Sequence, residues 1–200
     1  MEPEVTARAD LRQVAKDAIR REVAQRAIRL LDERGFDETT VEEIASAVGI
    51  SPRSFFRYFP TKEDIVISDL PAMGLLVEEA LKARPADEKP WVSLRAAMVP
   101  LVRTAEGDPE NILRSTRVGL STAGLRAKTI ERHTVWAALL APVLTDRLAG
   151  SGKHTDMAAQ ALAQSALACL YVATLAWSSS DGSDSYNDLL DEAFEAVGGR

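Results

Sequence analysis

The chain has 200 residues, of which 46% are hydrophobic and 27% are charged, a composition that is ordinary for a folded soluble protein and argues against a disordered chain. Its formal net charge of −6 argues against bulk affinity for nucleic acid, but the charge is uneven along the sequence. Residues 1–62 carry 11 Lys and Arg against 11 Asp and Glu, so the whole deficit lies downstream, where 13 cations face 19 carboxylates.

Two features bear on the cellular compartment. Residues 1–11 are acidic and polar and lack the apolar segment of an export signal, so we expect a cytoplasmic protein. The single cysteine, Cys169, has no partner for an internal disulfide and lies in an apolar run, which predicts a small core residue in a reducing interior.

A first helix is predicted over residues 10–34, because apolar residues recur there at mostly helical spacing and Gly35 ends the pattern. Basic residues precede or open this helix, namely Arg8, Arg12, Lys16, Arg20 and Arg21. An arm of this kind can reach DNA phosphates or a minor groove, which we expect of Arg20 and Arg21, whereas a solvated face explains the others better. Phe36 follows in a turn and is predicted to plug the helical unit from below.

A second, short helix is predicted between Thr40 and Gly49. Thr40 and Glu43 have the spacing of a capping box, in which each residue satisfies a free N–H of the other at the helix start. Gly49 is suited to leave the helix in a left-handed conformation. One side of the helix is apolar and consists of Val41, Ile44, Ala45 and Val48.

A third helix, of about eight residues, is predicted within Ser51–Pro60. Ser51 can cap its start, Pro52 suits the first turn, and Pro60 cannot continue it. Phe55 and Phe59 are four residues apart and face protein. The outer surface is then left to Arg53, Ser54, Arg57 and Tyr58.

The second and third helices together have the order of a helix-turn-helix, with a small Ala45, a corner at Gly49 and a large Phe55 that fills the angle. Three cations and no carboxylate lie between Ile44 and Lys62, as a phosphate-facing surface requires. We therefore expect the third helix to lie in the major groove of DNA. In this prediction Arg53, Ser54 and Arg57 face bases or nearby phosphates, and the backbone is held by Thr40, Ser51, Tyr58 and Lys62.

The span from about Arg20 to Val66 resembles the N-terminal domain of the tetracycline-repressor (TetR) family of bacterial transcription regulators. The resemblance is densest in GFDETTVEEIASAVGISPRSFFRYFPTKEDIV. Members often carry a tyrosine where this chain has Phe56, so a phosphate hydrogen bond from that position is lost, and Tyr58 is expected to take that role. The resemblance implies a ligand-responsive DNA-binding regulator, most often a repressor.

Thr61 and Asp64 repeat the capping-box spacing and predict a fourth helix from Lys62 to about Arg84, bent near Pro71. Lys62 in its first turn suits a DNA phosphate. Because the other end of this helix enters the C-terminal part of the chain, it can transmit a change there to the DNA-reading unit.

Further helices are predicted over residues 90–106, 109–120, 122–149, 155–179 and 184–197, and no strand pattern occurs. The fold class is therefore all-α, with about nine helices. A three-helix helix-turn-helix domain is expected over residues 10–66, with its motif at about 41–60. A larger helical domain for effector binding and dimerisation is expected over residues 67–200.

Large apolar side chains mark two helix faces in the C-terminal part, and core suits most of them better than pocket wall. The TetR resemblance implies an effector cavity there, so a few of them should line it. Pro142 inside a helical pattern is expected to bend the helix and help to open that cavity. The candidate lining residues are Trp91, Met98, Leu101, Val102, Arg117, His133, Trp136 and Leu140.

Basic residues gather around the junction of the helices predicted over 109–120 and 122–149, namely Arg114, Arg117, Arg126, Lys128, Arg132 and His133. Solvated surface and charge pairing at helix ends would explain them. The alternative is an entrance for an anionic, partly apolar ligand such as an acyl thioester of coenzyme A. His133 has no second ligand residue at suitable spacing, so no metal site is predicted.

Residues 157–180 contain no charged side chain, over a length that could span a bilayer. The run is rich in alanine, contains Gln and Ser, and lacks a flanking basic cluster, so a buried helix is the better interpretation. Its small residues permit close helix approach and, with the last helix, indicate a self-complementary dimer interface. The predicted interface residues are Ala158, Ala161, Ala166, Ala173, Leu189, Leu190 and Phe194.

These patterns predict a homodimeric DNA-binding regulator that responds to an apolar or acyl-CoA-like small molecule, needs no cofactor and has no membrane partner. Two other classes stay open: an all-helical enzyme, and a helical adaptor that uses the turn for protein contacts. The enzyme is disfavoured, because no Ser/His/Asp set, phosphate loop or metal cluster can be assembled with His133 and His154 as the only histidines.

Overall fold

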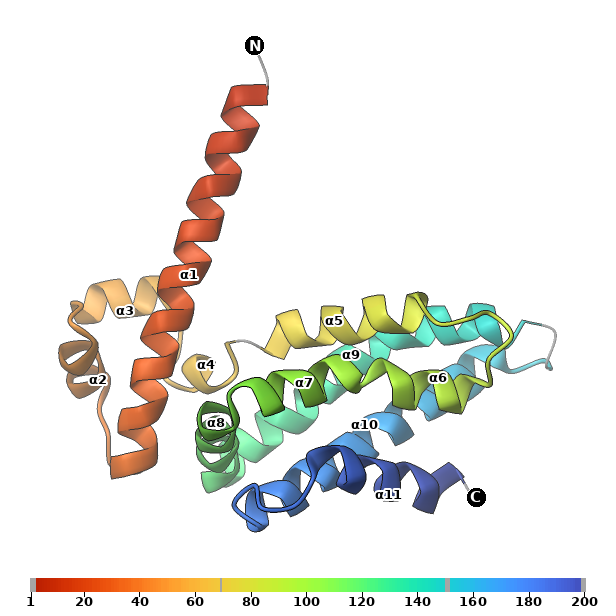
Figure 1. The fold of residues 1–200 in the computed structure, drawn as a ribbon. Helices are drawn as coiled ribbons and strands as arrows, with labels where there is room; N and C mark the ends of the chain where they lie inside the picture. The colour runs from red at the N-terminus through yellow and green to blue at the C-terminus, as the bar shows by residue number, and fades with distance from the viewer. Residues whose placement is uncertain (1–2, 69, 150–151, 199–200) are drawn as a thin grey trace.

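The computed structural model describes the backbone of residues 3–68, 70–149 and 152–198, and the side chains of residues 14, 16–68, 71–149 and 152–198 (Figure 1). Within these ranges the chain forms eleven helices and no strand, which confirms the all-α prediction. The helices are α1 (Pro3–Arg34), α2 (Val41–Val48), α3 (Pro52–Tyr58), α4 (Glu63–Val66), α5 (Leu70–Lys82), α6 (Pro90–Ala97), α7 (Val99–Gly107), α8 (Pro109–Ser121), α9 (Ala123–Arg147), α10 (Thr155–Ser179) and α11 (Tyr186–Gly198).

Two predicted helices are each divided in the structure, which accounts for the difference from nine. The helix expected over 62–84 becomes α4 and α5, and the one expected over 90–106 becomes α6 and α7. The second break lies at Met98, two residues before Pro100. A proline has no N–H for the carbonyl four residues earlier and its ring crowds that carbonyl, so the helix cannot run through without distortion.

Helix α1 is longer than predicted, because it begins at Pro3 rather than near residue 10. Figure 1 shows its N-terminal half projecting beyond α2 and α3. The expected arm residues Arg8 and Arg12 belong to this half, and their side chains lie outside the described residues.

The N-terminal helices enclose a core of their own. Leu31 of α1, Ile44 of α2 and Phe55 of α3 are almost completely buried, and burial of each such side chain contributes about 1.5–3 kcal/mol. Phe36 is buried in the same core, as predicted for a plug. Val118 of α8 also packs into this cluster, so the N-terminal unit of α1 to α4 shares its core with the body.

Helices α5 to α11 form an elongated body in which α10 packs between α9 and α11 (Figure 1). Its core includes Met98, Leu140, Leu167 and Phe194. By length and composition α10 is apolar enough to cross a bilayer. Its buried side packs into the helical body, as predicted for a core helix. Helix α9 runs from Ala123 to Arg147 with Pro142 inside it.

Candidate nucleic-acid interface and effector cavity

Helix α3 presents a polar face outward because its apolar residues are fixed inward. The Ser51 hydroxyl accepts the N–H of Ser54 at 3.1 Å and so caps the helix at its first turn. Phe55 and Phe59 are 0% exposed, with ring centroids 5.6 Å apart. The opposite face carries exposed Arg53, Phe56 and Arg57 and partly exposed Ser54 and Tyr58, as predicted for the polar members.

The turn before α3 has the predicted chemistry. Gly49 has φ 77°, a left-handed conformation that favours glycine, and the next N–H, of Ile50, donates to the Ala45 carbonyl at 2.9 Å. At the start of α2, the Thr40 hydroxyl accepts the Glu43 N–H at 3.2 Å while the Glu43 carboxylate accepts the Thr40 N–H at 2.8 Å. The Thr40 N–H and, secondly, the Thr40 hydroxyl both donate to the Glu43 carboxylate and so lower its pKa. The Thr40 cap and the Gly49 turn define the two ends of α2, and the Gly49 turn sets the direction in which the chain enters α3.

The two arginines of α3 have no carboxylate partner among the described residues. Arg57 lies over the Tyr58 ring at 5.0 Å, with its Nη2 3.4 Å from the Tyr58 hydroxyl. Phe56 is 50% exposed and stands edge-on to Phe55. The face therefore offers two uncompensated guanidinium groups, one phenol and one bare aromatic ring to an external partner.

A cavity of about 160 Å³ lies in the body where α7, α8, α9, α10 and α11 meet. Val66 of α4 and Met73 of α5 also line it, so the cavity touches the segment that joins the body to the DNA-reading unit. His133 projects from α9, and burial, followed by the charge of Arg132, lowers the pKa of its ring to about 4. The imidazole is therefore neutral near pH 7.

Comparisons with known proteins bear on both sites. Residues 24–68 match the sequence family described as bacterial regulatory proteins, tetR family, and residues 88–200 match the family described as the MftR C-terminal domain. The putative mycofactocin biosynthesis transcriptional regulator MftR of Mycobacterium tuberculosis is 30% identical over 179 residues, which cover 86% of this chain and 85% of that protein. The chain belongs to the tetR family of bacterial regulatory proteins. It is therefore a ligand-responsive DNA-binding regulator of transcription.

Further similarities are to a second curated relative and to two solved structures. The HTH-type transcriptional regulator TcmR of Streptomyces glaucescens is 32% identical over 143 residues, which cover 68% of this chain and 63% of TcmR. The fatty acid degradation regulator FadR of Bacillus halodurans has a TM-score of 0.65 at 19% identity, covering 90% of this chain and 95% of that one. FadR of Bacillus subtilis, in complex with stearoyl-CoA, has a TM-score of 0.61 at 21% identity, covering 87% and 95%. At these identities the two structures show a shared fold.

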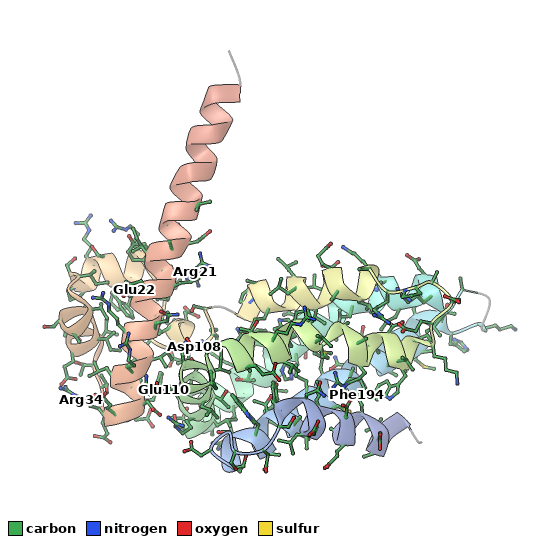
Figure 2. All side chains as sticks on the ribbon, viewed as in Figure 1. Arg21, Glu22, Arg34, Asp108, Glu110 and Phe194 are labelled. Carbon is green, nitrogen blue, oxygen red and sulfur yellow. The ribbon has the colours of Figure 1, made fainter. Side chains whose placement is uncertain are left out.

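The remaining members of the predicted DNA-facing set are more constrained than the sequence suggests. The Lys62 ammonium donates to the carbonyls of Phe36 at 2.7 Å and Thr39 at 3.0 Å and lies 4.1 Å from the Phe36 ring centre. Two of its three N–H groups therefore hold the turn between α1 and α2, which leaves one for a phosphate. Arg20 lies over the Phe59 ring at 5.5 Å, and Arg21 is exposed on α1 (Figure 2).

Only two of the eight predicted pocket residues, Leu101 and His133, line this cavity. Trp91 instead donates to the Phe194 carbonyl at 3.2 Å across the α6–α11 contact. Trp136 lines a separate groove between α5 and α9 and is 3% exposed. The other apolar candidates fill the body core, namely Met98, Val102 and Leu140. Bulky side chains pack against one another and close space, so they mark the core rather than the cavity.

Of the basic cluster, only His133 lines the cavity. Arg117 binds Asp32 of α1 and Asp181, and Arg114 pairs with Glu110 in the first turn of α8. The others also have intramolecular partners: Arg126 donates to the Leu120 carbonyl at 2.6 Å, Arg132 to the Ile67 carbonyl at 2.7 Å, and Lys128 lies 4.0 Å from Asp64. The expectation that Arg117 lines the pocket is therefore wrong.

Sequence reasoning missed the hydroxyl-bearing residues that line the cavity. They come from five helices, α7 to α11, and include Thr104, Ser115, Thr116, Thr129, Tyr171, Thr174 and Tyr186. The sequence does contain a signal for them, because they lie three or four residues from other lining residues on the same helix face. Thr116 has this spacing from Gly119 and Leu120, and Tyr171 has it from Thr174. Hydroxyl groups repeated on otherwise apolar helix faces indicate a polar surface inside a body.

Four of the predicted dimer residues are buried in their own subunit: Ala166, Ala173, Leu190 and Phe194. Their small or apolar side chains pack α10 against its own neighbours, so the prediction that they face a second copy is wrong. Ala158 and Ala161 are exposed and Leu189 is partly exposed. The exposed side of α10 carries Met157, Ala161, Ala168 and Val172, spaced at helical intervals; we call these four residues the outer stripe.

In the described ranges, no group of three or more His, Cys, Asp and Glu side chains is placed to hold a metal ion. Cys169 is buried, and its thiol lies 3.3 Å from the Ala193 carbonyl. Burial raises the pKa of that thiol. The cysteine is therefore an unreactive packing residue, as its place in an apolar run predicts.

Proposed function

We propose that the chain is a homodimeric cytoplasmic repressor, in which two α3 helices bind the half-sites of a palindromic operator and a small molecule in the body cavity releases the DNA. The observation that carries this proposal is the pair of uncompensated guanidinium groups, Arg53 and Arg57, on a helix whose inner face is fully buried. In a chain of net charge −6, two exposed arginines without a carboxylate partner among the described residues are better explained by an external anionic partner than by intramolecular ion pairs. DNA phosphates and guanine edges are the acceptors that such groups recognise.

Within this proposal Arg53, Ser54 and Arg57 contact bases or nearby phosphates, because they occupy the exposed face of α3. Tyr58 supplies a phenol hydroxyl at the edge of the same face, where it can donate to a phosphate. Other phosphate contacts come from Arg20, Arg21, the main-chain N–H of Ser51 and the third N–H of Lys62. The N–H and hydroxyl of Thr40 both donate to the Glu43 carboxylate, so Thr40 positions the start of α2 beside the DNA backbone. Phe56 has no hydroxyl, and its exposed ring suits the methyl group of a thymine.

The dimer is proposed to form through the outer stripe of α10. Val172 is 56% exposed there, and Met157 is 68% exposed on a helix otherwise embedded in the body. Two-fold packing of this stripe against its copy buries the same apolar surface on both subunits. In the proposed dimer the two α3 helices lie about one DNA turn apart, roughly 34–36 Å, because a palindromic operator requires that separation.

Two sets of contacts connect the cavity wall to the helices that hold α3, one through α4 and one through α1. Val66 of α4 lines the cavity, and Arg132 of α9 donates to the Ile67 carbonyl where α4 ends. Thr116 of α8 lines the cavity next to Arg117, which binds Asp32 of α1. A ligand that displaces α4 or α8 therefore shifts the DNA-reading unit relative to the body.

Two effector classes have support. A compact neutral molecule suits the described lining, which contains no Lys, Arg, Asp or Glu. A fatty acyl-CoA is the second candidate, because structural neighbours were solved with stearoyl-CoA and lauroyl-CoA. The cations near the cavity count against it, since Arg117 and Arg132 already have intramolecular partners.

The experiment that tests the repressor proposal measures DNA binding by fluorescence anisotropy, with the DNA upstream of the chain's own gene and a random duplex of equal length. We expect binding that is tighter for one palindromic segment and has two subunits per site. Val172→Glu should give a monomer in sedimentation and lose operator binding, whereas Val135→Glu, at an equally exposed valine of α9, should change neither. Equal affinity for all duplexes at low salt would refute the proposal.

A further inference from the structure

The cavity is lined by polar groups that cannot ionise near pH 7. Besides His133, which is neutral, its polar side chains are hydroxyls from threonine, serine and tyrosine. Burying an ion in such a site is costly, because no opposite charge compensates the lost hydration. The lining therefore selects against carboxylates, phosphates and ammonium groups.

Several of these hydroxyls have their proton committed to the protein. Thr174 donates to the Leu170 carbonyl at 2.7 Å, so the 2.9 Å contact between its oxygen and the Tyr186 hydroxyl must use the proton of Tyr186. Thr129 donates to the Leu125 carbonyl at 3.1 Å and Thr104 to the Pro100 carbonyl at 2.9 Å. These four oxygens retain acceptor lone pairs and have no proton left for a ligand.

Other groups in the lining are uncommitted. Ser115, Thr116 and Tyr171 make no hydrogen bond to any described residue through their hydroxyls. The His133 ring contacts those of Trp136 and Tyr171, with centroids 5.9 and 6.0 Å apart. The cavity thus combines fixed acceptors, free hydroxyls and aromatic surface.

The size of the cavity limits the ligand. Its volume of about 160 Å³ is close to the roughly 150 Å³ of an engineered protein cavity that holds benzene. One ring, or two fused rings with one edge toward the opening, can be accommodated. The coenzyme part of an acyl-CoA would have to lie outside, where Arg114 and Arg117 are already paired with carboxylates.

From this geometry we infer that the effector is an uncharged molecule of one or two fused rings that carries a hydroxyl or N–H donor. Its donor binds the fixed acceptor oxygens of the threonines and Tyr186, and its own oxygen accepts from Thr116 or Tyr171. The inference rests on the proposed function, because it names the ligand class of the same cavity.

The test compares four probes by titration calorimetry on the full-length dimer without DNA. They are 1-naphthol, 1-methoxynaphthalene, 1-naphthoate and lauroyl-CoA. We expect 1-naphthol to bind best, with 1-methoxynaphthalene about five- to tenfold weaker because it has no proton to donate. Naphthoate should bind still more weakly, because its carboxylate finds no cation in the lining.

Variants locate the binding site. Thr116→Val and Tyr171→Phe each remove one hydroxyl at nearly constant volume, and together they should weaken 1-naphthol binding about tenfold. Thr134→Val makes the same change on the exposed side of α9 and should leave the affinity unaltered. The comparison of the four probes on the unmodified protein needs no variant, so the test survives if a variant does not fold.

Failure of this inference is separable from failure of the proposed function. Tighter binding of naphthoate or lauroyl-CoA than of 1-naphthol would overturn the ligand class, while release of operator DNA by either one would leave the repressor intact. No binding of 1-naphthol, or binding that ignores Thr116 and Tyr171, would also overturn it. Binding of 1-naphthol by a protein that never binds an operator would uphold the ligand class and refute the repressor.

Discussion

Arg117 of α8 and Asp32 of α1 form a two-pronged ion pair, with Nε 3.1 Å from Oδ1 and Nη2 2.8 Å from Oδ2. The pair joins the body to the DNA-reading unit, and the residue before Arg117 lines the cavity. We predict that Asp32→Asn weakens the coupling between effector and DNA. Because the pair is partly exposed, the free energy of unfolding should fall by about 1 kcal/mol or less.

The measurement is the ratio of operator dissociation constants with and without effector. In Asp32→Asn this ratio should move toward one, while operator affinity without effector changes little. Glu22→Gln is the matched control, because it breaks an ion pair with Arg26 that lies wholly within α1. An unchanged ratio in Asp32→Asn would show that the effect of the ligand reaches the DNA-reading unit through α4, at Val66, rather than through the Arg117–Asp32 pair.

Arg57→Ala should weaken operator binding by about 1–3 kcal/mol and relax the sequence preference at one position of each half-site. The reason is that Arg57 has no carboxylate partner among the described residues and stands on the exposed face of α3. Competition with a library of single-base operator variants measures both effects. Equal loss on operator and random DNA would remove Arg57 from the base-reading role.

Lys62→Met should act first on stability, because its ammonium holds two carbonyls between α1 and α2. Leaving those carbonyls without this donor should cost about 1–3 kcal/mol of unfolding free energy. The dependence of DNA binding on salt should flatten by no more than about one phosphate contact. Urea unfolding with and without DNA separates the two effects; full stability together with a flatter salt slope would favour a phosphate role alone.

Glu88 makes stability depend on pH in the acid range. Hydrogen bonds from Arg84 and Ser93 lower the pKa of its carboxyl from 4.5 to about 2. Because the folded pKa is the lower one, the contribution is complete above pH 4.5 and is lost as the pH falls from there toward 2. Glu88→Gln should therefore lower stability at neutral pH and flatten the acid slope of the unfolding free energy, as measured by urea titrations at several pH values.

Gly74→Ala should destabilise the body. A Cβ at this position would lie 2.6 Å from Nε1 of Trp136, whose side chain is held in the core and cannot move freely. Overpacking of this kind typically costs about 1–3 kcal/mol. Gly124→Ala is the control, because the nearest atom lies at 4.0 Å and a helical alanine is favoured by about 0.5–1 kcal/mol. A Gly74→Ala protein that is as stable as Gly124→Ala would show that α5 moves readily away from α9.

Local sequence signals predicted the DNA-reading unit well. The caps at Thr40 and Ser51 depend on residues three positions away, and the corner at Gly49 depends on carbonyls three and four positions back. The inward Phe55 follows from helical spacing alone. Lys62 shows the limit of this reasoning. Its partners lie 23 and 26 residues away, so a cation that looked free in the sequence is bound in the fold.

The cavity could not be predicted from large apolar residues, because those residues fill space. It exists where small or hydroxyl-bearing side chains such as Ala105, Ser115 and Gly119 leave room between helices. The prediction of the dimer interface was wrong for a related reason. Small residues such as Ala166 and Ala173 show that α10 packs closely against something, but the pattern does not say whether the neighbour is its own subunit or a copy.

Tyr171 and Val172 are consecutive on α10, yet the first lines the cavity and the second stands on the outer stripe. One helix therefore forms part of the cavity wall and also the surface proposed to contact the second subunit. Ligand binding in one subunit should change the ligand affinity of the other. Induction is then expected to follow a sigmoidal dose–response, with a Hill coefficient between one and about two.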